Sequence, residues 1–108
     1  MIHVLVIDDD EKICLFFMKL LARMGYQCQA AQTLEQARSL FRSNTCDLVL
    51  LDLELPDGNG LDLLPEFTAS DAAPEIIIIT GTGDSRGAEL AFKYGAWDYV
   101  QKPFLLDD

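Results

Sequence analysis

Short apolar runs rich in β-branched residues alternate with stretches of helical periodicity, and this alternation constrains the fold more than any other feature of the sequence. The expected strands lie at residues 2–7, 26–31, 47–51, 75–80 and 97–101, and the signal at 26–31 is weak. Strands that alternate with helices in this way predict a parallel sheet with helices on both faces. Because crossovers between parallel strands are right-handed, few topologies remain. We therefore expect an α/β fold, with a doubly wound, five-stranded parallel sheet in a single domain spanning residues 1–108.

The first two helical stretches carry clear signals for where each helix begins, buries its apolar face and ends. The apolar stripe of the first comprises Ile13, Phe16, Phe17, Leu20, Leu21 and Met24. Their spacing is that of an amphipathic helix, and Gly25 predicts its C-terminal end. Thr33 and Gln36 have the spacing of a capping box, which predicts the start of the second helix.

The second half of the chain is less regular. The segment LELPDGNG predicts a turn, with Asp57 as a turn residue. A short helix is expected at residues 61–67, where Pro65 lacks a backbone donor and would bend or shorten it. The side chains expected to pack inward in the last part of the chain are Ala88, Ala91, Phe92 and Trp97.

Composition excludes several classes of partner and location. Asp and Glu number 18 against 8 Lys and Arg, for a net charge of −10. Such a surface repels phosphate backbones, so we expect no direct nucleic-acid binding. No apolar run approaches the ~20 residues of a membrane span, and no signal peptide follows Met1. Cys14, Cys28 and Cys46 lack paired spacing and predict free buried thiols in a reducing, cytoplasmic compartment.

Polar residues follow the apolar runs at the points where the predicted strands end. They are Asp8, Asp9, Asp52, Thr80 and Lys102. In parallel sheets, ligands bind beyond the carboxyl ends of the strands, so these side chains are expected to share one edge. Two carboxylates ~4 Å apart repel by about 4 kcal/mol at an effective dielectric of ~20, so three require a counter-charge. A hard divalent cation such as Mg²⁺ supplies it, since Mg²⁺ prefers oxygen ligands.

Four motifs resemble landmarks of a known family. VIDDD, VLLDLELPDGNG, IIIITGTGD and DYVQKPF each stand at the end of a predicted strand and occur in this order. Together they resemble the response-regulator receiver domain of two-component signalling, over essentially the whole chain. The resemblance implies a flavodoxin-like sheet with strand order 2-1-3-4-5. It also implies a fifth helix, of which residues 105–108 could form only the first turn, so that the helix is truncated.

The resemblance implies a phosphoacceptor and its metal ligands. Asp52 would accept the phosphoryl group as an acyl phosphate. Asp9 would bind Mg²⁺ directly and Asp8 would assist, while the main-chain carbonyl of Glu54 would be a further ligand. Mg²⁺ is the implied cofactor.

The resemblance also implies the residues that respond to phosphorylation. Thr80 would donate its hydroxyl to a phosphoryl oxygen, and Lys102 would contact another. A cis peptide between Lys102 and Pro103 would position that lysine. Tyr99 would change rotamer with phosphorylation state, which makes Thr80 and Tyr99 the switch residues.

The implied partners follow from the same family. A sensor histidine kinase would be the phosphodonor, because the only histidine, His3, lies within the first strand. The segments TGTGD, GLDLLPEF and GAWDYVQKPF are most similar to receivers of sigma-54-dependent transcriptional activators. We therefore expect this domain to be the N-terminal regulatory part of a longer protein with downstream ATPase and DNA-binding domains. A second copy of the chain, forming a homodimer, is a further possible partner. Apart from phosphoryl transfer to its own Asp52 and its hydrolysis, no enzyme activity is expected.

Two other functions fit part of the pattern. Haloacid-dehalogenase-like phosphatases also use a nucleophilic Asp with Mg²⁺, Thr and Lys, but their nucleophile ends the first strand and a second Asp follows two residues later. Here the presumed nucleophile ends the third strand, and Glu54 stands two residues after Asp52. The other alternative is a receiver that serves only as a binding surface.

Overall fold

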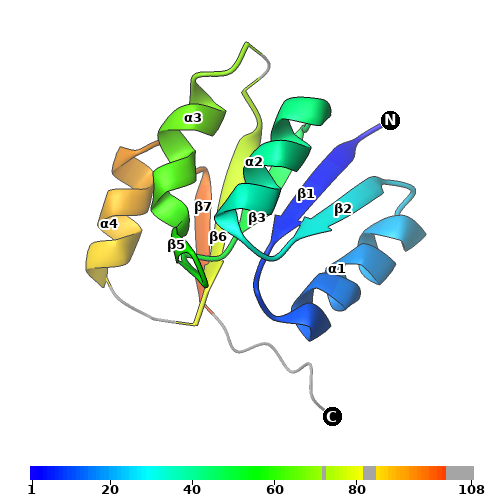
Figure 1. Ribbon diagram of the computed structural model, residues 1–108, viewed down its shortest axis with the longest axis horizontal. Helices are drawn as coiled ribbons and strands as arrows, with labels where there is room; N and C mark the ends of the chain where they lie inside the picture. The colour runs from blue at the N-terminus through cyan, green and yellow to red at the C-terminus, as the bar shows by residue number, and fades with distance from the viewer. Residues whose placement is uncertain (72, 82–84, 102–108) are drawn as a thin grey trace.

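The secondary structure follows the predicted alternation of strands and helices (Figure 1). The computed structural model describes residues 1–71, 73–81 and 85–101. The elements are β1 (His3–Ile7), α1 (Glu11–Arg23), β2 (Gln27–Ala31), α2 (Leu34–Ser43), β3 (Leu48–Leu51), β4 (Glu54–Leu55), β5 (Gly58–Asn59), the 3₁₀-helix η1 (Gly60–Leu63), α3 (Leu64–Thr68), β6 (Glu75–Thr80), α4 (Ser85–Lys93) and β7 (Asp98–Gln101). None of the helices in these ranges is long and apolar enough to cross a membrane.

Five strands form one parallel sheet in the order β2-β1-β3-β6-β7. Numbered along the chain within this sheet, the order is 2-1-3-4-5, which confirms the predicted doubly wound topology. From β1 the chain leads to β2 on one side, whereas β3 pairs on the other side of β1. The topological switch point therefore lies between β1 and β3, where this class of fold binds ligands. The expected first turn of a truncated fifth helix, at residues 105–108, lies outside the described residues.

Two apolar clusters pack against the two faces of the sheet. The large core lies between the sheet and α2, α3 and α4; its helical members are Leu34, Ala37, Leu64, Phe67 and Ala91. The small core lies on the other face, where α1 contributes Cys14 and Leu21. Alternate residues of β1 supply each cluster, as the period of a strand requires. Strand β1 is therefore buried on both faces of the sheet.

The predicted helix signals are confirmed in α1 and α2. Gly25 has φ of 85°, and its N–H donates to the main-chain oxygen of Ala22 at 3.0 Å. This left-handed conformation ends α1, as glycine at that position predicts. Thr33 Oγ1 accepts a hydrogen bond from the Gln36 N–H at 3.0 Å and caps α2. The Gln36 side chain reaches back one residue further than a standard capping box, to the Gln32 N–H.

Several inward-facing predictions are wrong. On α1, Ile13 and Leu21 are buried, but Phe16, Leu20 and Met24 are exposed. The buried face of α1 is centred closer to Cys14, so the apolar stripe is wider than the surface that contacts the sheet. On α4, Ala91 is buried as predicted, but Phe92 is 51 % exposed. Trp97, which precedes β7, is 64 % exposed.

The segment after β3 contains structure that the sequence did not predict. A two-stranded antiparallel hairpin, β4 and β5, turns at Pro56 and Asp57. The expected short helix is divided into η1 and α3. Pro65 lies in the first turn of α3, where the missing N–H would have no helical partner, so the helix accommodates it. The hairpin begins two residues after Asp52 and therefore borders the predicted site.

Candidate functional site

Three carboxylates meet at the carboxyl ends of β1 and β3. Asp8, Asp9 and Asp52 each offer an oxygen, and these oxygens all lie within 4.8 Å of one another. Asp8 is 2 % exposed and Asp52 is 5 % exposed, whereas Asp9 faces solvent. We call these three residues the acidic rim. The structure thus brings together the acids that the sequence predicted as one site.

The backbone register of the sheet explains why these acids meet. Ile7 pairs with Leu51 at the ends of β1 and β3, so the next residue of each strand emerges at the same edge. The N–H of Asp52 donates to the main-chain oxygen of Ile7 at 2.8 Å. The N–H of Asp8 donates to the main-chain oxygen of Ala31 at 3.0 Å, at the end of β2. Backbone hydrogen bonds at the ends of β1, β2 and β3 therefore fix the main-chain positions of Asp8 and Asp52.

Neutral backbone donors face the rim carboxylates. The N–H of Asp10 donates to Asp8 Oδ1 at 2.9 Å, and the N–H of Glu54 donates to Asp52 Oδ1 at 3.3 Å. Asp10 itself caps α1, with its Oδ1 accepting from the N–H of Lys12 at 2.9 Å. The third acid of the VIDDD motif is thus a helix cap and not a member of the rim. These dipoles stabilise the carboxylates but carry no net charge.

Cys14 lies beneath the rim, in the small core. Its thiol donates to the main-chain oxygen of Asp8 at 3.2 Å. Burial raises the pKa of Cys14 to about 11, and the negative charges of Asp8 and Asp10 add to this effect. The thiol is therefore protonated at neutral pH and able to donate. The three cysteines are free, as predicted, although Cys28 is only half-buried.

The two predicted switch residues lie on neighbouring strands. Thr80 ends β6, which pairs with β3, and it is fully buried. Tyr99 pairs with Ile78 in β7 and packs, half-buried, against the large core. Thr80 therefore lies at the same end of the sheet as Asp52, and Tyr99 lies one strand further out.

Lys102 and Pro103 lie outside the described residues. They follow Gln101, which pairs with Thr80 at the end of β7. The predicted roles of Lys102 and of the peptide bond before Pro103 remain predictions.

The donor set of the rim suits a hard divalent cation. Three carboxylates within one small volume repel one another, and two of them are shielded from water. Carboxylate and main-chain oxygens are the ligands that Mg²⁺ takes in proteins, and one or two carboxylates suffice. Within the ranges that the structure describes, no other group of three His, Cys, Asp or Glu side chains meets in this way. The residues present therefore fit Mg²⁺.

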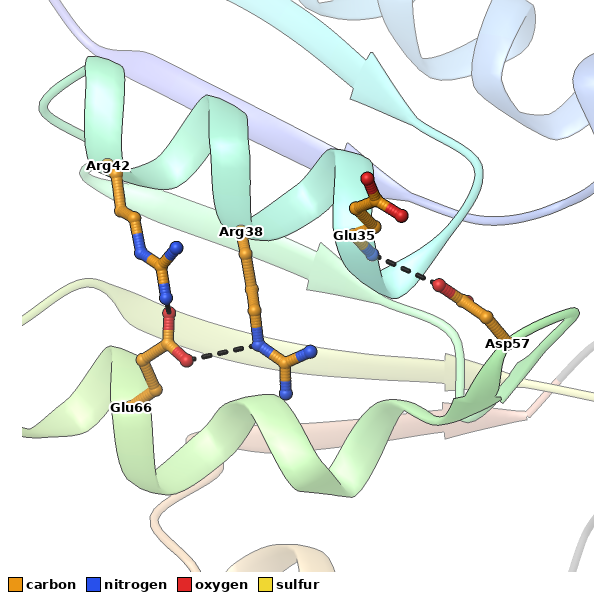
Figure 2. Close-up of polar contacts among 5 residues, drawn as sticks. All are labelled: Glu35, Arg38, Arg42, Asp57 and Glu66. Atoms are coloured by element: carbon orange, nitrogen blue, oxygen red, sulfur yellow. Dashed lines mark hydrogen bonds and ion pairs between the residues drawn. The ribbon is translucent and has the colours of Figure 1, made fainter.

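Two residues near the rim have roles that the sequence did not reveal. Gly60 lies so close to the main-chain oxygen of Asp52 that any Cβ would overlap it, so only glycine fits. Asp57 is a turn residue, as predicted, but it also reaches the first turn of α2 (Figure 2). The turn motif PDGNG marks both positions as turn residues, but nothing local in the sequence indicates what they contact.

Comparison with known proteins places this chain in a family. The response regulator receiver domain matches residues 4–108. The regulatory protein VanRB of Enterococcus faecalis is 39 % identical over 105 residues, which cover 97 % of this chain and 47 % of that protein. The transcriptional regulatory protein DcuR of Escherichia coli is also 39 % identical, over 96 % of this chain and 45 % of its own length. The chain therefore spans about half the length of these curated relatives.

A solved structure gives the same result for the fold. A response regulator protein from Burkholderia pseudomallei, described with a phosphorylated aspartic acid, a calcium ion and citrate, superposes with a TM-score of 0.91. It is 28 % identical, over 99 % of this chain and 63 % of its own. With the acidic rim at its switch point, this chain belongs to the receiver domain family of response regulators. This match confirms the predicted family. Receiver domains are regulatory modules of two-component systems. The finer likeness to receivers of sigma-54-dependent activators stays a prediction.

Proposed function

We propose that this chain is a phosphorylation-dependent switch whose phosphoacceptor is Asp52. One observation carries the proposal: Asp52 is nearly buried and lies within 4.8 Å of two further carboxylates from a neighbouring strand end. Repulsion on this scale destabilises the fold, and it is relieved when a cation binds. Membership of the receiver family favours this function over the phosphatase alternative.

The proposed cofactor is Mg²⁺, held by the acidic rim and by the main-chain carbonyl of Glu54. Asp9 is the exposed member and would bind the ion directly, with Asp8 assisting. When bound, Mg²⁺ neutralises negative charge on the carboxylates and on the phosphoryl oxygens. A calcium ion accompanies a phosphorylated aspartic acid in the Burkholderia pseudomallei relative, which supports a divalent site here.

The proposed phosphodonor is a phosphohistidine on a sensor kinase. An oxygen of Asp52 attacks phosphorus, the bond from phosphorus to the imidazole nitrogen breaks, and the imidazole retains the electron pair. The chain's contribution is positioning, because the N–H of Glu54 holds Asp52 Oδ1 at 3.3 Å. Hydrolysis of the acyl phosphate then restores the carboxylate, and we propose no other enzyme activity.

The proposed switch couples Thr80 to Tyr99. Phosphorylation replaces the carboxylate charge with a group of about −1.5 to −2 and three acceptor oxygens. The buried hydroxyl of Thr80 is at the same sheet edge and would donate to one of them, while Lys102 would contact another. Movement of Thr80 would then alter the packing of Tyr99 against the large core. Such a local event can bias a two-state element.

The output is proposed to lie outside this chain, which spans about half of its curated relatives. Residues 1–108 would be the N-terminal receiver of a longer cytoplasmic protein with ATPase and DNA-binding domains, and it could act as a homodimer. A net charge of −10 does not suit DNA binding by the receiver itself.

Acetyl phosphate provides the first test. We expect the chain to be labelled in the presence of Mg²⁺, with loss of labelling in Asp52→Asn, measured by mass spectrometry. Asp71→Asn, which removes an exposed acid after α3, is the control for net charge. Equal labelling of Asp52→Asn and wild type would refute the assignment. Sustained turnover of p-nitrophenyl phosphate would instead support a phosphatase.

A further inference from the structure

The tip of the β4–β5 hairpin is bound to the start of α2. Asp57 Oδ1 accepts a hydrogen bond from the N–H of Leu34 at 2.8 Å, and Oδ2 accepts one from the N–H of Glu35 at 3.1 Å. Figure 2 shows Asp57 directed at this first turn of α2. The first N–H groups of a helix have no partner within the helix, so a carboxylate is a suitable acceptor. One side chain therefore joins the hairpin to a helix that begins 23 residues earlier.

This contact does more than cap α2, because α2 has a cap of its own. Thr33 precedes the helix and accepts from the N–H of Gln36 at 3.0 Å. Asp57 instead satisfies two different N–H groups and comes from another element. The hydrogen bond from Leu34 lowers the pKa of Asp57. The hydrogen bond from Glu35 and the positive charge of Arg38 act in the same direction. Both carboxylate oxygens are thus acceptors at neutral pH.

The other end of the hairpin is bound to the acidic rim. The N–H of Glu54 donates to Asp52 Oδ1, and the N–H of Gly60 donates to the main-chain oxygen of Leu53 at 2.8 Å. Between these points each strand has only two residues, and Gly58 and Asn59 are exposed. A hairpin this short has little stability of its own. Its orientation therefore depends on its contacts with the rest of the molecule, and those of Asp57 are made at its tip.

We propose that Asp57 is a positioning residue, which holds β4 so that the main-chain carbonyl of Glu54 completes the cation site of the acidic rim. The inference rests on the proposed function, because it assumes that Glu54 contributes a ligand. Asp57 does not touch the ion; it acts through the hairpin. Leu55, buried in the large core, anchors the middle of the hairpin, so loss of Asp57 would loosen the tip without unfolding the segment.

The test compares Asp57→Ala with two further variants. Titration of Mg²⁺ followed by calorimetry should show about a tenfold loss of affinity in Asp57→Ala, the size typical for groups that orient metal ligands. Asp57→Asn keeps one oxygen acceptor and should fall between Asp57→Ala and wild type. Thr33→Ala removes a cap from the same helix but leaves the hairpin contact, so its Mg²⁺ affinity should equal that of wild type. Thermal unfolding of each variant confirms that it is folded.

Two further readouts separate this inference from the proposed function. Amide hydrogen exchange at Leu34 and Glu35 should accelerate in Asp57→Ala, and labelling by acetyl phosphate should recover at saturating Mg²⁺. If Thr33→Ala loses as much Mg²⁺ affinity as Asp57→Ala, or if neither loses any, the positioning role is wrong while the proposed function stands. If wild type neither binds Mg²⁺ nor accepts phosphate, the proposed function itself is wrong.

Discussion

The large core and the acidic rim meet at the end of strand β3, yet they affect folding stability in opposite directions. Val49 and Leu51 are fully buried in the large core and stabilise the fold by leaving water. One residue further along, Asp52 is almost as buried but lies among carboxylates. Bringing like charges together away from water costs free energy. The comparison shows that consecutive residues can have opposite effects on stability: Leu51 stabilises the fold, whereas Asp52 destabilises it and belongs to the site.

Hydrogen bonds from the main chain explain how the fold tolerates the acidic rim. Main-chain N–H groups of Asp10 and Glu54 donate to rim carboxylates, whereas the core offers apolar contacts alone. These hydrogen bonds reduce the cost of burying charge without cancelling it. The remaining cost is what binding of a cation can recover.

The largest expected effect tests the core. Phe67 is fully buried in α3 and stacks on Phe41, with ring centroids 3.9 Å apart. Phe67→Ala should lower the free energy of unfolding by about 3–5 kcal/mol, because it removes this contact and leaves a cavity. Urea unfolding measures the change.

Phe92→Ala is the matched control, since the same side chain is 51 % exposed on α4. It should change the free energy of unfolding by no more than about 0.5 kcal/mol. Similar losses in the two variants would show that the large core does not dominate stability.

The second effect tests the rim. In the absence of metal, Asp52→Asn should raise the free energy of unfolding, because it removes one charge from the repelling group. The gain should lie between about 1 and 4 kcal/mol, the limits for one pair of charges in water and at an effective dielectric of ~20. Urea unfolding in EDTA provides the measurement.

Addition of Mg²⁺ sharpens this test. At about 100 times its dissociation constant, Mg²⁺ should add about 2.7 kcal/mol to wild type, and less to Asp52→Asn at the same concentration. Asp71→Asn changes the net charge equally and should follow wild type. A metal-free Asp52→Asn protein less stable than wild type would contradict the proposed cost of the rim.

The smallest effect concerns a thiol that borders the small core. Burial raises the pKa of Cys28 from 9.0 to about 11, so the folded state disfavours its ionised form. The stabilising contribution is complete below about pH 9 and is lost as the pH rises toward 11, because the unfolded chain ionises first. Cys28→Ala should therefore show a shallower loss of stability between these pH values. Parallel urea titrations of the two proteins measure it, and identical pH slopes would contradict it.

The fold was predictable because its signals are local and repeated. The inner strands β1, β3 and β6 are mainly apolar runs, and residues such as Gly25 and Thr33 mark helix ends by their own conformational chemistry. The acidic rim was predictable for a related reason, since parallel strands place their carboxyl ends at one edge. Asp8 and Asp52 needed no further information than the positions of two strands.

The errors arose where tertiary contacts decide the outcome. Periodicity showed that α1 has an apolar stripe but not how much of it the sheet covers, so Phe16 and Leu20 were wrongly assigned to the interior. The hairpin was missed because two-residue strands are too short to have a period. The contact of Asp57 with α2 joins residues 23 apart, and no local pattern indicates it.

The position of Trp97 has a practical consequence for optical experiments. It is the single tryptophan of the chain and stands, mostly hydrated, just before β7, while the carboxylates gather where the strands finish. Its indole is surrounded by water at the amino ends of the strands. Its emission will therefore be insensitive to events at the carboxyl ends, where the acidic rim lies. A spectroscopist who wants to watch the switch would do better to install a fluorophore or a ¹⁹F label near the hairpin.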